Sequence, residues 1–157
     1  MERARPGDGG KGGVAGGAPR RHLRVACAII EQDGLVLVAQ RSSTMSLPLK
    51  WEFPGGKIRD GELPAGCLQR ELREELGIAA AVREALPPST HHYADFSVTL
   101  HPFRCAEPSG PITLHEHAAI IWLAPEELGR LDWAEADLPV IAEYLARRRA
   151  GGAAAHS

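Results

Sequence analysis

The chain has little of what marks several common classes of protein. Its 157 residues include only three cysteines, which stand far apart and form no CxxC pair, so neither a zinc site nor a disulfide framework is expected. No apolar run approaches the roughly 20 residues that cross a bilayer. The N-terminus has no apolar stretch of the kind found in secretory signals. These absences predict a cytoplasmic protein that has no membrane partner.

A strong excess of charge of either sign is also missing. The formal net charge is −2, from 18 Lys and Arg against 20 Asp and Glu. This balance argues against a protein that holds nucleic acid polymers by general electrostatics. The chain is long enough for one domain with a hydrophobic core.

The composition divides the chain into a domain and two tails. Residues 1–20 are dominated by Gly, with scattered Arg, Pro and Ala, and have almost nothing to bury, so a flexible tail is expected. The segment 150–157 is expected to be a disordered C-terminal tail. The folded domain is therefore predicted over residues 21–149, as a monomer or a homodimer.

Two apolar, β-branched runs, 24–31 and 34–41, open the domain. They are separated by Asp33-Gly34, a strong hairpin signal, so they are expected to pair as antiparallel strands. Further strands are expected around 79–85, 90–105 and 118–123, followed by one helical turn at 125–128.

Two helices are expected, at 64–76 and 137–149. The first begins near Pro64 and ends at Gly77, which fits the preference for Pro early and Gly late in a helix. Leu68, Leu72 and Leu76 form its core-facing stripe. Because strands precede and follow this helix and a second helix closes the chain, the pattern predicts an α/β sandwich.

The first helix is crowded with acids. Glu71, Glu74 and Glu75 stand three and four residues apart, so their carboxylates project from neighbouring turns of one side. Like charges placed this way destabilise a bare helix, which favours a cation between them; a solvated acidic face is the alternative. An oxygen-only ligand set suits Mg2+, or Mn2+, far better than zinc.

The same stretch resembles the signature of the Nudix hydrolase family. The matching residues are Gly56, Glu62, Arg70-Glu71-Leu72, Glu74-Glu75 and Gly77-Ile78, at every defined position of the Nudix box. Flanking segments resemble the MutT-type branch, in particular bacterial 8-oxo-dGTP diphosphatases and the CTP and 5-substituted-dCTP pyrophosphohydrolases. These segments are 38–41, 51–57, His115-Glu116-His117 ahead of Trp122, and 136–139. The likeness covers roughly 23–147 and leaves out the N-terminal tail.

The resemblance implies a Nudix fold, a mixed β-sheet sandwiched between α-helices. It implies a Mg2+-dependent enzyme that hydrolyses a nucleoside triphosphate to the monophosphate and pyrophosphate by attack at the β-phosphorus. Removal of oxidised or modified nucleotides such as 8-oxo-dGTP is the role expected for this branch. Hydrolysis of CTP, of 5-substituted dCTP or of another nucleoside diphosphate derivative stays open, as does a non-catalytic nucleotide-binding module, although every acid of the box is present.

The resemblance also assigns the catalytic and metal-binding residues. Glu71, Glu74 and Glu75 match the metal-binding acids of the box, with Glu71 or Glu74 as the general base. Gly56 is expected to offer its backbone carbonyl to the metal. The alternative is that it is a glycine required only by a turn. Glu116, outside the box, matches a position at which relatives supply another metal ligand or catalytic acid.

Other residues of the motif are expected to support the acids. Arg70 should orient them by charge-assisted hydrogen bonds, and Glu62 resembles the structural acid of the box. His115 and His117 flank Glu116. On a strand their rings would share one face without a third ligand, so a zinc site is not expected there.

Five residues are expected to bind substrate: Arg41, Glu52, Phe53, Tyr93 and Asp137. Arg41 matches a position that contacts phosphate in relatives, with a surface arginine at a strand end as the alternative. Phe53 and Tyr93 are aromatic walls for a base, or core residues. Asp137 stands where relatives specific for 8-oxo-dGTP often have Asn; a carboxylate only accepts hydrogen bonds, which leaves the base preference open, and helix capping is its alternative role.

Overall fold

The computed structural model describes residues 21–155, and side chains as far as residue 151; the tail predicted for 1–20 lies outside this part of the chain. The elements, in chain order, are β1 (Arg21–Gln32), β2 (Leu35–Gln40), β3 (Trp51–Glu52), β4 (Gly55–Lys57), α1 (Pro64–Leu76), β5 (Ala79–Ala85), β6 (Ser89–His92), β7 (Phe96–Ser109), β8 (Ala119–Leu123), the short 3-10 helices Pro125–Arg130 and Glu135–Asp137, and α2 (Leu138–Ala155).

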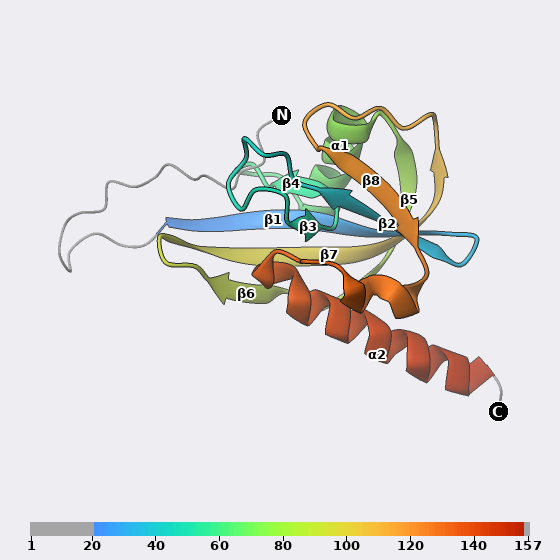
Figure 1. Cartoon of the computed structure of the whole chain (residues 1–157). Coiled ribbons are helices and arrows are strands. Elements are labelled where there is room, and N and C mark those ends of the chain that lie inside the picture. The colour runs from blue at the N-terminus through green and yellow to red at the C-terminus, as the bar shows by residue number, and fades with distance from the viewer. Residues whose placement is uncertain (1–20, 156–157) are drawn as a thin grey trace.

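The centre of the fold is a mixed sheet built on two long neighbouring strands. β1 and β7 run parallel, in register from Arg21 opposite Phe96 to Glu31 opposite Ala106. The sheet order is β3-β2-β1-β7-β5, while β4 pairs with β1, β6 with β7 and β8 with β2. Figure 1 shows β1 and β7 side by side through the middle of the molecule. Because the far edge of β1 is shared between β4 and β2, the sheet splits there.

The first two strands form the predicted hairpin. Asp33 and Gly34 have φ values of 53° and 79°, the pair of left-handed conformations that a tight two-residue hairpin turn requires. β1 and β2 pair antiparallel beside this turn. The hairpin prediction is therefore confirmed.

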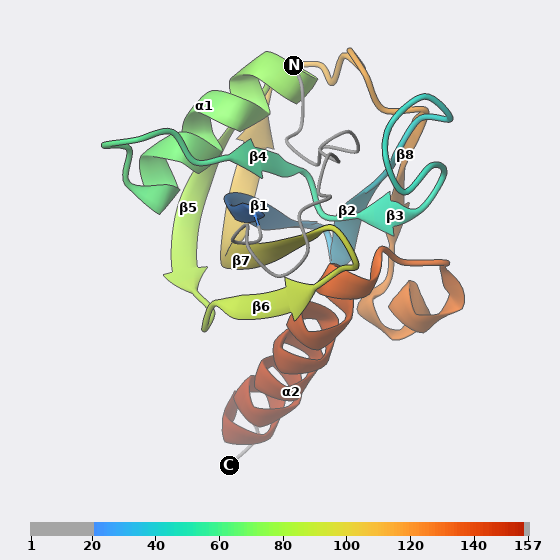
Figure 2. The ribbon, with the colours of Figure 1, turned by 90° about the vertical axis from the view of Figure 1, so that its left-hand side faces the viewer.

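Each face of the sheet is covered by one helix, as Figures 1 and 2 show. Along β1, Val25, Cys27 and Ile29 belong to the core cluster beneath α2. The alternate residues, Ala26, Ala28 and Ile30, belong to the cluster beneath α1. A strand buried on both faces reads as a continuous apolar run rather than an alternating one, which is why 24–31 looks as it does in the sequence. The predicted sandwich of a mixed sheet between helices is confirmed.

Helix α1 has the predicted bounds. Pro64 occupies its first turn, and Gly77 ends it with φ 71°, its N–H donating to the carbonyl of Arg73. A left-handed residue at this position favours glycine. Leu68, Leu72 and Leu76 are all buried against the sheet. The acids of α1 therefore lie beside a fixed core stripe.

Two local predictions were wrong. Helix α2 starts at Leu138 and runs to Ala155, past the predicted end at 149. His115-Glu116-His117 lies in the loop before β8, not on a strand, so its two rings do not share a sheet face. The tail predicted from 150 thus begins in helix, and residues 156–157 lie outside the described part. No helix within residues 21–155 is both long and apolar enough to cross a membrane.

Candidate active site

The acidic helix meets the sheet at the glycine pair of β4. A Cβ at Gly55 would lie 1.9 Å from the backbone oxygen of Ala26, and a Cβ at Gly56 would lie 2.2 Å from the carboxyl carbon of Glu71. A side chain at Gly55 would clash with backbone, and one at Gly56 would displace the Glu71 carboxylate. The glycines therefore let β4 approach β1 closely on one side and let the Glu71 carboxylate rest against the backbone of Gly56 on the other.

The three acids of α1 differ in their access to solvent. Glu71 and Glu75 are buried, with relative exposures of 2% and 1%, whereas the side chain of Glu74 is 40% exposed. Burial of a carboxylate is unfavourable unless it is paired and hydrogen-bonded. The helix therefore carries two charges inside the protein and a third at its surface.

Arg70 connects these acids. Its Nη1 donates to Glu71 at 3.0 Å and to Glu74 at 3.2 Å. Its Nε and Nη2 donate to the two oxygens of Glu62 at 2.6 and 2.8 Å, and Nη2 also reaches the Lys57 carbonyl. One guanidinium thus holds the box acids in a fixed order, as predicted for Arg70.

Glu62 is the structural acid of this arrangement. The hydrogen bond from Arg70, together with one from the backbone N–H of Arg59, lowers the pKa of Glu62 from its ordinary value of 4.5 to about 2. Both oxygens are occupied by Arg70, so Glu62 serves to fix the guanidinium. The geometry agrees with the structural role expected of it.

This shift predicts an acid-dependent loss of stability. A carboxyl whose pKa is depressed on folding stabilises the fold above its unfolded pKa, and the contribution disappears as the pH falls through its folded pKa. Unfolding in urea should show wild type more stable than Glu62→Gln at neutral pH, with the difference shrinking between about pH 4.5 and about pH 2. Glu126→Gln, an exposed acid on the 3-10 helix, is the matched control. A difference that stays constant down to pH 2 contradicts the Arg70–Glu62 account.

The residues around Gly56 fit a hard divalent cation. The Glu71 carboxylate and the Gly56 backbone share one confined space, and the Gly56 carbonyl accepts a weak hydrogen bond from the buried Cys67 thiol. Among residues 21–155, no three His, Cys, Asp or Glu side chains converge into a ready-made ligand cage. Mg2+ is usually bound by one or two carboxylates, with substrate phosphates and water completing its octahedron. This donor set fits that pattern better than a closed zinc cage.

A second cluster of buried polar side chains, Arg41, Glu52 and His117, extends to Glu75 of α1. Arg41 is 1% exposed and Glu52 is 0% exposed, and Arg41 Nη1 donates to Glu52 Oε1 at 3.1 Å. His117 Nε2 lies 2.9 Å from the other oxygen of Glu52, and His117 Nδ1 lies 3.5 Å from Glu75 Oε1. The reading of Arg41 as a surface arginine is therefore wrong. Its contact with phosphate stays a prediction.

Sequence reasoning missed His117. The two carboxylates that face its ring stand 42 and 65 residues away in the chain, as the positions 75 and 52 show. The available signal was the histidine pair that flanks Glu116, and nothing in the sequence links it to Glu52. Glu116 itself is partly buried beside His117 in the loop before β8, and its role as a metal ligand stays a prediction.

Three of the predicted substrate-binding residues, Phe53, Tyr93 and Asp137, lie near the start of α2. The ring of Phe53 is buried and packs on Trp133 with centroids 5.0 Å apart, which favours the core alternative for this side chain. Its backbone N–H donates to the buried carboxylate of Asp137 at 3.0 Å. Tyr93 stacks on Phe96 and accepts the N–H of Ala136 through its hydroxyl. Asp137 and Tyr93 therefore both secure the chain just before α2.

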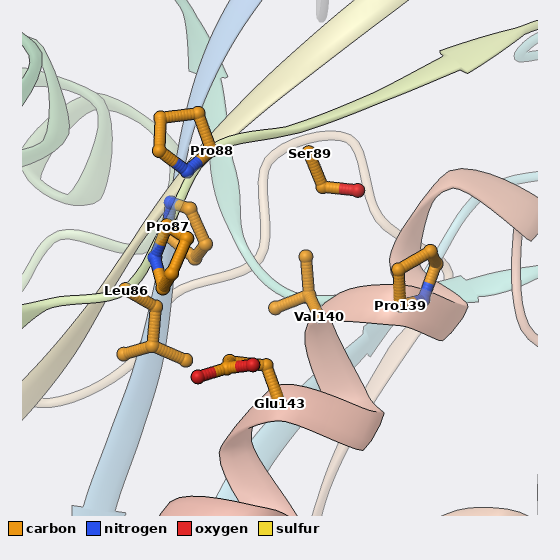
Figure 3. A pocket seen from close by; sticks show the side chains of 8 residues that line it. Leu86, Pro87, Pro88, Ser89, Pro139, Val140 and Glu143 are labelled. Carbon is orange, nitrogen blue, oxygen red and sulfur yellow. The ribbon is translucent and has the colours of Figure 1, made fainter.

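Two clefts that the acids of α1 do not line differ in the residues that line them. A pocket of about 200 Å3, shown in Figure 3, lies between the segment before β6 and the start of α2. Its lining is Leu86, Pro87, Pro88, Ser89, Pro102, Pro139, Val140 and Glu143, none of them a predicted site residue. A larger cleft of about 510 Å3 is lined by residues 21–24 of β1 and 57–60 after Gly56, and carries Arg21, Arg24, Lys57 and Arg59. This second cleft is mostly cationic.

The fold and the site together define a class of protein. They combine a mixed sheet between two helices with a glycine strand pressed against a carboxylate-bearing helix. The chain belongs to the Nudix family: the NUDIX domain model matches residues 20–144. It is a Nudix hydrolase, and members of this family generally use divalent metal ions.

Relatives with names support this assignment. The chain is 38% identical over 128 residues to the CTP pyrophosphohydrolase of Escherichia coli K12, covering 82% of this chain and 95% of the relative. It is 37% identical to the putative 8-oxo-dGTP diphosphatase 2 of Mycobacterium tuberculosis, covering 83% and 92%.

Solved structures show the same likeness. The Escherichia coli ORF135 protein matches with a TM-score of 0.75 and 37% identity, covering 83% of this chain and 94% of that one. A MutT protein of methicillin-resistant Staphylococcus aureus 252, described as a Nudix hydrolase, matches with a TM-score of 0.68 and 39% identity, covering 82% and 99%. The predicted MutT-like resemblance is confirmed.

Proposed function

We propose that this protein is a Mg2+-dependent nucleoside triphosphate pyrophosphohydrolase that clears modified nucleotides. The observation that carries the proposal is the contact between Gly56 and the Glu71 carboxylate, with Glu74 and Glu75 on the same side of α1. This arrangement places one carboxylate against the Gly56 backbone and two more on the same helix of a Nudix fold. Relatives named as diphosphatases and pyrophosphohydrolases support the reaction class.

Gly56, Glu71, Glu74 and Glu75 would hold the metal, with Glu116 as a further ligand. Bound there, Mg2+ neutralises phosphate charge and lowers the pKa of the attacking water. Arg70 holds Glu71 and Glu74 beside each other by donating to both through one nitrogen. Either carboxylate can then accept the proton of the attacking water, Glu74 being the one more open to solvent.

The cationic cleft supports a phosphate-bearing substrate. Lys57 directly follows Gly56 in β4, and Arg24 and Arg59 line the same cleft. Clefts lined by one sign of charge concentrate ligands of the opposite sign. We infer that this cleft draws the triphosphate toward the acids of α1, which would otherwise repel it.

The reaction is tested by the products. Purified protein with Mg2+ and a nucleoside triphosphate should release pyrophosphate and the monophosphate; release of orthophosphate alone contradicts the proposed cleavage. In water enriched in oxygen-18, attack at the β-phosphorus puts the label into pyrophosphate. Label in the monophosphate would instead mean attack at the α-phosphorus. Omitting the metal, or adding a chelator, should abolish turnover.

Asp137 bears on the choice of base. Its carboxylate is an acceptor only, and one oxygen already receives the N–H of Phe53. An acceptor can receive hydrogen bonds from the N1–H and N2–H2 of guanine or from the amino group of cytosine. It cannot donate a hydrogen bond to guanine O6. We propose oxidised guanine nucleotides such as 8-oxo-dGTP as substrates, with CTP and 5-substituted dCTP as the second candidates, because named relatives of both kinds match at similar identity. A pyrophosphate-release screen across these nucleotides ranks the two by kcat/KM.

A further inference from the structure

His117 occupies a place that a merely space-filling residue would not need. Its side chain is 1% exposed, and each ring nitrogen faces a buried carboxylate. Nε2 donates to Glu52 at 2.9 Å, since an ionised carboxylate only accepts. Nδ1 lies 3.5 Å from a carboxylate oxygen of Glu75, longer than an ordinary hydrogen bond but close enough for the ring and the carboxylate to pack directly against each other.

The contact continues beyond Glu52. Its other oxygen accepts Arg41 Nη1, and Arg41 is fixed in turn by Ser46, whose carbonyl accepts Nε at 2.6 Å and whose hydroxyl accepts Nη2 at 3.0 Å. The series Arg41, Glu52, His117, Glu75 runs from the end of β2, through β3 and the loop before β8, to α1. It joins the end of β2 and β3 to α1 through side chains, beside a backbone hydrogen bond that Thr113 of the same loop donates to Leu76 of α1.

We propose that His117 is a positioning residue that sets the Glu75 carboxylate on α1 relative to Arg41 at the end of β2. The inference rests on the proposed function, in which Glu75 holds the metal, and on the phosphate contact that the sequence predicts for Arg41. A rigid imidazole with nitrogens on two edges fixes the separation of the groups it faces. Partners of this kind behind metal ligands typically contribute about 10–100-fold in metal affinity.

The two sides of the ring can be removed separately. The side-chain amide of Asn reaches the position of Nδ1, and that of Gln reaches the position of Nε2. His117→Gln therefore keeps a donor for Glu52 and loses the group facing Glu75. His117→Asn keeps a group facing Glu75 and leaves Glu52 without its second donor, which loosens Arg41.

The proposal predicts opposite effects for this pair of variants. His117→Gln should weaken Mn2+ binding to the nucleotide-free protein about tenfold, measured by electron paramagnetic resonance, with KM for the nucleotide changed less than about twofold. His117→Asn should leave Mn2+ affinity within about twofold and raise KM about tenfold. The thermal midpoint of each variant reports stability independently. Glu126→Gln serves as the control.

Each possible result bears on the positioning role of His117 or on the proposed function. Equal effects of both variants on Mn2+ affinity and on KM, or unchanged values of both with only a lower thermal midpoint, would overturn the proposal and leave His117 a packing residue. Wild type that binds no Mn2+ and turns over no nucleotide would instead refute the proposed function. Glu74→Gln, which lies outside the His117 contacts, separates the two: weak Mn2+ binding there with normal binding in both His117 variants rejects the positioning role alone.

Discussion

Replacing Glu74 by glutamine should lower kcat by roughly three orders of magnitude and leave the fold intact. Gln has nearly the shape of Glu, so the change removes a charge and little else. That charge is the most solvent-accessible of the three on α1, with 40% of the side chain exposed, and it is a candidate for both the metal ligand and the base. A variant with near-normal turnover would remove Glu74 from the mechanism.

The stability of the metal-free protein should change little. Arg70 keeps its hydrogen bonds to Glu62 and Glu71 when Glu74 is neutral, so the loss is one partly exposed ion pair of about 0.3–0.5 kcal/mol. Neutralising one of three neighbouring acids also relieves like-charge repulsion of about the same size. The metal-free variant should therefore melt within a few degrees of wild type.

The measurement compares melting with and without metal. A ligand that binds only the folded state stabilises it in proportion to the logarithm of its concentration over its dissociation constant. Wild type should gain stability on addition of Mg2+ or Mn2+, and Glu74→Gln should gain much less. Glu126→Gln, with a normal gain and normal kcat, is the control for loss of an acid as such.

Gly56→Ala should abolish most of the activity through the metal site. The added methyl would lie 2.2 Å from the Glu71 carboxyl carbon, so that side chain must leave its present place. We expect a loss of about 10–100-fold in Mn2+ affinity and a loss of stability of about 1–3 kcal/mol from overpacking. Electron paramagnetic resonance for the metal and urea unfolding for the stability separate the two effects.

Two neighbouring glycines calibrate this result. In α1, a methyl added at Gly66 would meet nothing within 4 Å, so Gly66→Ala should stabilise the protein by about 0.5–1 kcal/mol and leave metal binding unchanged. Gly55→Ala would press against the backbone of Ala26 and should destabilise more than Gly56→Ala. If Gly56→Ala binds Mn2+ as well as Gly66→Ala does, the Gly56–Glu71 contact is not part of the metal site.

Local features were predictable from the sequence. The bounds of α1 follow from Pro64, Gly77 and the leucine stripe, all within one segment, and the β1–β2 hairpin follows from two residues of its turn. The arrangement of Arg70 between the box acids was also predictable, because these residues share one helix and the loop just before it. In each case the interacting groups are close in the chain.

Contacts between distant segments were not predictable in the same way. From the sequence, Arg41 is only an arginine at the end of a strand, and His117 is only one of two neighbouring histidines. In the structure, both contact Glu52 of β3. Phe53 and Asp137 are 84 residues apart, yet the carboxylate binds the backbone two residues before Gly55. The burial of these charges depends on tertiary pairing, which a single sequence does not display.

The parallel pairing of β1 with β7 also bears on how the chain folds during synthesis. β1 is made first, but its partner ends at Ala106 in the shared register, and β8, which follows His117, pairs with β2 later still. Pairings so distant in the chain form slowly and leave apolar strands uncovered while they wait. On the ribosome, the acids of α1 therefore emerge before the sheet is complete, since β5 to β8 follow them in the chain, and the domain acquires its native order only as its last third appears.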